Sequence, residues 1–228
     1  MGWQEFDSDA DRYEQWYTSQ EGERVDKSER KLLEWLLHRI PNARSILDVG
    51  CGTGHFTALF ADQGLFAIGL DRAPAMIAAL RRLHPTLPAL LGDAHELPFQ
   101  EGAVDVTAFV ATVEFLDQPE VALKEAIRVS RKGLILIVLN KWSGGGFSRR
   151  WGKQARGRKL GKAHDYSLLQ LAKLVRAAAS NRMQRLSWMS ALYPFGPAEL
   201  LAHVPLGDVI GLAVTLSPAS SSESPQEF

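Results

Sequence analysis

The sequence predicts an α/β fold of three layers, in which a mostly parallel sheet of seven strands lies between helices. Short apolar runs alternate with amphipathic segments from residue 46 to residue 139, which is typical of a parallel sheet with right-handed crossovers. A glycine-rich turn follows the first of these runs. The last two apolar runs have no helical pattern between them, so we expect antiparallel pairing at one edge of the sheet.

The expected elements follow from hydrophobic period and from helix signals. Five buried strands are expected at 46–49, 65–70, 89–91, 104–110 and 134–139, and two more at 184–192 and 209–216. Helices should follow the first, second and fourth strands, and Pro74 and Pro119 suit the first turn of two of them. Ser167 can cap a further helix before the last pair of strands.

The chain divides into one main domain with a lead-in and a tail. Residues 1–41 are a charged and aromatic lead-in with an amphipathic helix at about 26–39, and 42–216 form the α/β domain. A basic, glycine-rich insertion at about 143–165 has few apolar positions, which is typical either of a solvated loop or of a lid that orders over an anionic acceptor. The Ser- and Pro-rich tail at 217–228 is expected to be disordered.

Composition limits the range of functions. The 228 residues carry 26 Lys and Arg and 26 Asp and Glu, so no global charge favours nucleic acid or an anionic membrane. The single cysteine, Cys51, fits a reducing compartment, and no apolar run approaches the ~18 residues of a spanning helix. We therefore expect a cytoplasmic protein without a membrane partner, present as a monomer or homodimer.

Three glycines in the run Ile46–Gly54 point to a small ligand. Gly50, Gly52 and Gly54 come just after a strand, where the chain must turn sharply and a ligand can lie against bare backbone. A dinucleotide site of the G-x-G-x-x-G type would have glycine at position 55, which is His55 here. Asp48, two residues before the first glycine, suits an ammonium group better than a pyrophosphate.

Two further acids end neighbouring strands. Asp71 follows the second strand, where nucleoside sites of α/β proteins hold ribose hydroxyls with a carboxylate. Asp93 follows the third strand and can accept a hydrogen bond from an adenine amine. Because the carboxyl ends of parallel strands meet at one edge, these acids and the glycine turn should share a cleft.

Four linked segments carry a resemblance. The runs ILDVGCGTGHFT, GLDRAPAMI, GDAHELPF and VDVTAFVATVEFLDQPEVALKEAIRVSRKG resemble, in order and spacing, the motifs of class I S-adenosylmethionine-dependent methyltransferases, in particular the small ubiquinone-methyltransferase-like members. The resemblance covers about residues 42–140. It implies a Rossmann-like methyltransferase domain with S-adenosylmethionine as cofactor and S-adenosylhomocysteine as product.

The resemblance also implies roles for single residues. Gly50, Gly52 and Gly54 would admit the methionine and ribose part of the cofactor, Asp71 would grip the ribose diol, and Asp93 with the amide of Ala94 would read the adenine. The remaining residues expected at the cofactor are Asp48, Cys51, Arg72, Met76, Ala111 at the methionyl group, and Tyr13 closing over the site. Cys51 is a small residue between glycines and needs no chemistry of its own.

The acceptor is not readable from these motifs. Where many relatives have histidine after the fourth strand, this chain has Phe115, so a common candidate base is missing and no catalytic residue is assigned. The scattered histidines predict no metal site. A small-molecule acceptor is the first hypothesis. The alternatives are an RNA methyltransferase, for which the zero net charge is unfavourable, a non-catalytic module that binds S-adenosylmethionine, and a nicotinamide oxidoreductase.

Overall fold

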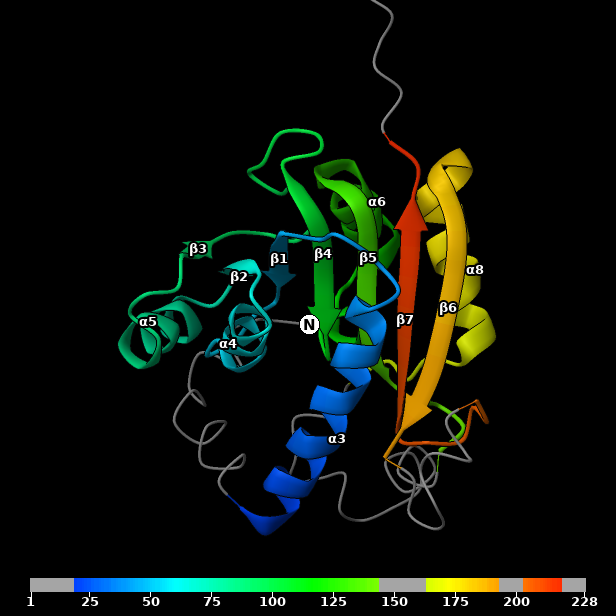
Figure 1. Cartoon of the computed structure of the whole chain (residues 1–228), viewed down its shortest axis with the longest axis horizontal. Helices are drawn as coiled ribbons and strands as arrows, with labels where there is room; N and C mark the ends of the chain where they lie inside the picture. The colour runs from blue at the N-terminus through cyan, green and yellow to red at the C-terminus, as the bar shows by residue number, and fades with distance from the viewer. Residues whose placement is uncertain (1–18, 144–162, 193–202, 219–228) are drawn as a thin grey trace, which may run out of the picture.

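The computed structural model describes residues 19–143, 163–192 and 203–218. Within them one sheet of seven strands runs in the order β3-β2-β1-β4-β5-β7-β6 (Figure 1). The strands are β1 Ser45–Val49, β2 Phe66–Asp71, β3 Ala89–Leu91, β4 Val104–Val110, β5 Ser130–Leu139, β6 Met183–Ala191 and β7 Val209–Leu216. The first five pair in parallel, whereas β7 is antiparallel to both β5 and β6. The expected fold class is confirmed, with the antiparallel strand next to the outermost strand β6.

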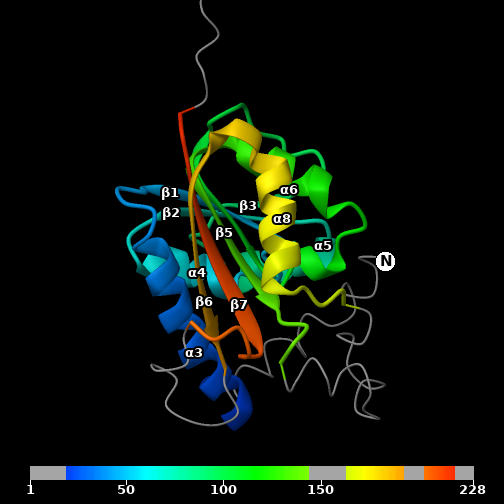
Figure 2. The same ribbon diagram turned by 90° about the vertical axis from the view of Figure 1, so that its right-hand side faces the viewer.

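Helices cover both faces of the sheet, which gives the three layers (Figure 2). The helices are α3 Gln20–Leu37, α4 His55–Asp62, α5 Pro74–Leu83, α6 Pro119–Val129 and α8 Leu168–Ala179. On one face α3 and α4 pack on Ile46, Val106 and Ile135, and on the other α6 and α8 pack on Leu47 and Leu134. Successive strand residues point to opposite faces, so each buried strand contributes to both cores.

Two helix starts show how local signals set the boundaries. Helix α3 begins six residues before the expected position because the Ser19 side chain accepts a hydrogen bond from the backbone N–H of Gly22. Helix α8 begins after Ser167, as predicted, and a capping box joins Ser167 to Gln170 in both directions.

Several expectations lie outside the described residues. Tyr13, most of the basic insertion and all but the first two residues of the tail at 217–228 fall in undescribed stretches. In the part of the chain that is described, no helix combines the length and apolar character needed to cross a membrane.

Candidate cofactor site

A cavity opens at the carboxyl ends of β1, β2 and β4, the edge at which open parallel sheets bind ligands. Its walls come from the glycine turn after β1, from the ends of β2 and β3, and from the segment after β4. The lining residues are Val49, Gly50, Gly52, Leu70, Asp71, Arg72, Ala73, Met76, Gly92, Asp93, Ala94, His95, Val110, Ala111, Thr112, Phe115, Leu116 and Asp117. Eight of the residues predicted at the cofactor therefore share one cavity.

The glycine turn presents backbone to this cavity. Gly50 and Gly52 adopt φ angles of 74° and 55°, in the left-handed region that favours glycine. The backbone N–H groups of Gly50 and Cys51 donate to the carbonyl of Leu70, at 2.7 and 3.1 Å, which fixes the turn against the end of β2. The space beside Gly52 is open, whereas the Thr112 side chain lies against Gly50, so a ligand can approach the main chain most closely at Gly52.

Asp71 joins the glycine turn to the start of α5. Its two carboxylate oxygens accept hydrogen bonds from the backbone N–H groups of Gly52 and Ala73, both at 2.8 Å. Burial raises the pKa of Asp71, and the hydrogen bonds from Ala73 and Gly52 oppose that rise. Each carboxylate oxygen keeps a second lone pair, so Asp71 can still accept from the hydroxyl groups of a ribose.

Asp93 is held by two neighbours in the same cavity. One oxygen, Oδ1, accepts from the backbone N–H of His95 at 3.0 Å and lies 2.6 Å from His95 Nδ1. The other, Oδ2, lies 3.5 Å from the Arg72 guanidinium. Partial burial would raise the pKa of Asp93, but the His95 hydrogen bonds and the charge of Arg72 outweigh it and lower the pKa. Asp93 is therefore an ionised group that only accepts hydrogen bonds near neutral pH.

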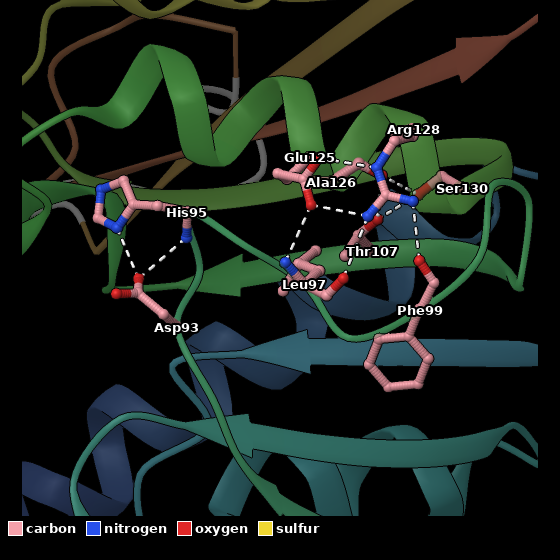
Figure 3. A network of polar contacts seen from close by, with 9 residues as sticks. All are labelled: Asp93, His95, Leu97, Phe99, Thr107, Glu125, Ala126, Arg128 and Ser130. Carbon is pink, nitrogen blue, oxygen red and sulfur yellow. Dashed lines mark hydrogen bonds and ion pairs between the residues drawn. The ribbon is translucent and has the colours of Figure 1, made fainter.

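The loop that follows Asp93 is tied to helix α6 by a polar network (Figure 3). The Arg128 guanidinium donates to the carbonyls of Phe99 and Leu97, at 2.8 and 3.1 Å, and to both carboxylate oxygens of Glu125. Glu125 in turn accepts from the backbone N–H of Leu97 at 2.9 Å. The N–H groups of the planar Arg128 guanidinium thus hold the loop between Asp93 and Phe99, which has no regular secondary structure, against α6.

Replacing Arg128 with Leu should loosen this loop. The change keeps an apolar stem but removes the Arg128 donors from the carbonyls of Phe99 and Leu97, of which Leu97 keeps the backbone N–H of Phe99 at 2.8 Å, so we expect a loss of about 1–3 kcal/mol in the free energy of unfolding. Urea denaturation measures it. Arg128→Lys, which keeps the charge without the planar fork, should recover only part of the loss. A Leu variant as stable as the parent would contradict the assigned role.

The far wall of the cavity was only partly predicted. Ala111 lies there as expected and adopts φ 50°, an unusual conformation for a residue with a Cβ. Thr112, Phe115 and Leu116 join it from the segment after β4, and His95 from the loop after Asp93. Of this wall only Ala111 was predicted at the cofactor, because the course of the chain after β4 sets the wall and no motif marks the other residues.

Three predicted residues lie close to the cavity without lining it. Asp48 is completely buried beneath the turn, where its carboxylate accepts from the Thr57 hydroxyl at 2.7 Å, and burial raises its pKa to about 7. Burial and the nearby carboxylates raise the pKa of the Cys51 thiol, so it is no nucleophile. Gly54 begins α4 with φ 92° and packs under Leu80. Asp48, Cys51 and Gly54 therefore pack beneath the glycine turn and do not face the cavity.

Comparison with known proteins agrees with this arrangement. Residues 47–138 match a protein family described as "Methyltransferase domain". An uncharacterized methyltransferase of Mycobacterium bovis is 37% identical over 44% of this chain and 40% of its own length. A demethylmenaquinone methyltransferase of Renibacterium salmoninarum is 32% identical over 48% of this chain and 46% of its own length. The chain thus spans less than half the length of either relative.

A solved structure extends the likeness of fold beyond the matched segment. A Thermotoga maritima S-adenosylmethionine-dependent methyltransferase, described as a possible histamine N-methyltransferase, has a TM-score of 0.73. It is 24% identical and the comparison covers 94% of this chain and 99% of that chain. The sheet order defines a Rossmann-like α/β fold, and the cavity lies where such folds bind their ligands. More narrowly, the segment at residues 47–138 is similar to methyltransferase domains, and this similarity covers less than half of the chain.

Proposed function

We propose that this protein transfers the methyl group of S-adenosylmethionine to a small-molecule acceptor. The observation that carries the proposal is the meeting of three features in one cavity: the side-chain-free turn at Gly50 and Gly52, and the carboxylates of Asp71 and Asp93. A nucleoside with an amino-acid arm has a diol, an exocyclic amine and a narrow polar chain, and each feature of the cavity fits one of these.

The residues have separate tasks in this proposal. Asp71 accepts from the ribose hydroxyls, and Asp93, beside Ala94, accepts from the adenine amine, while Met76 and Arg72 flank the base. Gly50, Gly52 and Ala111 leave room for the methionyl arm. When bound, S-adenosylmethionine supplies an electrophilic methyl group on a sulfonium, so the chain mainly has to orient an acceptor and exclude water.

Support for a small acceptor comes from the walls and from the charge of the chain. Phe115 and Leu116 give the cavity an apolar side after β4. Lys and Arg balance Asp and Glu at 26 each, which gives no general attraction for nucleic acid. One of the relatives is named for methylation of demethylmenaquinone, a small molecule. The similarity to that relative covers 48% of this chain, so it does not identify the acceptor.

Calorimetric titration tests the cofactor part of the proposal. S-adenosylmethionine and S-adenosylhomocysteine should both bind the protein at micromolar level, and NAD should not. Asp71→Ala should weaken the binding of both by at least about tenfold, because it removes the diol acceptor and releases the N–H groups of Gly52 and Ala73. Asp62→Asn, at the exposed end of α4, is a control expected to leave both affinities unchanged.

The result also decides between the remaining functions. Turnover of radiolabelled S-adenosylmethionine with an extract of small metabolites, and not with RNA, would support the proposal. Failure of the parent protein to bind either methyl-cycle ligand would reject it. Tight binding without turnover in either extract would favour the non-catalytic module.

A further inference from the structure

His95 lines the cavity, and the sequence motifs assign it no role. It follows Asp93 and Ala94 in the loop after β3 and contacts the Asp93 carboxylate twice, through its backbone N–H and through its ring. Figure 3 shows the ring and the backbone N–H converging on the same oxygen of Asp93. Two donors from one residue thus fix a carboxylate whose side chain is 37% exposed.

The chemistry of the pair sets the direction of the hydrogen bond. Near neutral pH Asp93 is ionised and only accepts, so the proton between the two groups belongs to His95 Nδ1. The other ring nitrogen, Nε2, is buried and has no hydrogen-bond partner among the described residues, which therefore give the ring no second hydrogen bond. The contact with Asp93 is the interaction that orients this imidazole.

The consequence concerns the second oxygen of Asp93. Because Oδ1 is occupied by both His95 donors, Oδ2 is left to face Arg72 and the cavity. An acceptor oxygen in a fixed position distinguishes an exocyclic amine, which donates, from a carbonyl oxygen, which repels it. A carboxylate free to rotate would lose part of this discrimination.

We propose that His95 is a positioning residue for base specificity, which aims the Asp93 carboxylate so that the site selects an adenine over a hypoxanthine nucleoside. The proposal rests on the proposed function, since it assumes that an S-adenosyl ligand occupies this cavity. It assigns His95 no contact with the reacting atoms and no proton transfer during methyl transfer.

The test compares two ligands that differ only in the base. S-adenosylhomocysteine and its deaminated analogue S-inosylhomocysteine are titrated into the parent protein, His95→Asn and His95→Leu. The Asn side-chain nitrogen takes the place of Nδ1 and keeps the donor, while Leu keeps bulk without it. The parent should prefer the adenine ligand by at least about tenfold, Asn should keep that preference, and Leu should reduce it at least about threefold.

A double-mutant cycle separates positioning from general packing. In an Asp93→Ala background the preference for adenine should be small, and adding His95→Leu should change it no further, because the two residues act through one hydrogen bond. Thermal unfolding of each variant shows whether the fold is kept.

The outcomes are distinguishable. If the parent binds neither ligand, the proposed function fails and this inference fails with it. If the parent binds S-adenosylhomocysteine with a clear preference and folded His95→Leu keeps the same preference, the proposed function stands and the role of His95 is overturned. Equal loss of preference in the Asn and Leu variants would also overturn it, because the retained donor should have rescued Asn.

Discussion

Glu29→Gln is expected to stabilise the protein above pH 8 and to change its stability little below about pH 4.5. Glu29 lies in helix α3 with 9% of its surface exposed, and its Oε2 has no hydrogen-bond partner in the described part of the chain. Burial, and to a smaller degree the neighbouring charge of Asp26, raise the pKa of Glu29 from 4.5 to about 8.

The position of Glu29 explains this burial. Leu32, Leu33 and Leu36 are the residues with which α3 packs on the sheet, and Glu29 precedes Leu32 and Leu33 by one helical turn on the same face. Asp26 is the charged neighbour that raises the pKa of Glu29. Its own carboxylate lies 2.7 Å from His55 Nε2 and is paired with Arg30. Among the described residues, neither Arg30 nor His55 forms an ion pair with Glu29, so the carboxylate form of Glu29 lacks compensation there.

The sign of the pH effect follows from proton binding. Between pH 4.5 and about pH 8 the folded protein keeps the Glu29 proton and the unfolded chain has lost it, so the free energy of unfolding falls as pH rises through this window. The loss is complete above pH 8. A shift of this size corresponds to as much as about 5 kcal/mol, and relaxation around the carboxylate will reduce it to a few kcal/mol.

Urea denaturation at pH 4.5, 6.5 and 8.5 measures the effect. The stability difference between Glu29→Gln and the parent should grow with pH across this range. Glu34→Gln removes the same charge from the exposed side of α3 and controls for net charge. A Glu29→Gln curve parallel to that of the parent at all three pH values would show that Glu29 is ionised without cost in the folded protein.

The sheet could be predicted from sequence because its signals are local. Buried parallel strands are continuous apolar runs, and Pro74, Pro119 and Ser167 mark helix starts within one turn. The start of α3 was predicted too late because the segment before residue 26 is polar, and only the capping contact of Ser19 extends the helix. The order of the strands in the sheet was not predicted, because it depends on tertiary pairing that local signals do not encode.

The part of the cavity that is formed by residues at strand ends could be predicted from the sequence. Gly50, Asp71 and Asp93 lie at strand ends, so their meeting follows from the parallel sheet. The side-chain direction of Asp48 was not predictable, since a strand residue can face either layer, and here it points to Thr57 of α4. His95 was not singled out because its role depends on a contact with Asp93 two residues away.

Gly50→Ala is the substitution from which we expect the largest loss in the glycine turn. A Cβ at position 50 would lie 2.2 Å from Thr112 Cγ2 and 2.6 Å from Thr112 Oγ1, and the φ of 74° is strained for any residue with a side chain. Strain of about 1–2 kcal/mol and overpacking of about 1–3 kcal/mol give an expected loss of about 2–5 kcal/mol in the free energy of unfolding. Binding of S-adenosylhomocysteine should fall with it, because Gly50 and Thr112 both line the cavity.

Gly52→Ala is the matched control two residues further along the same turn. Gly52 has a comparable φ of 55°, but a Cβ there would meet no atom within 4 Å, so Gly52→Ala should cost only the strain of about 1–2 kcal/mol. Adding Thr112→Ala removes the two atoms closest to the new Cβ and should reduce the cost of Gly50→Ala while leaving that of Gly52→Ala unchanged. Urea denaturation of the single and double variants measures both differences. Equal losses for the two glycine variants would mean that backbone strain alone, and not the approach of Thr112, requires glycine at position 50.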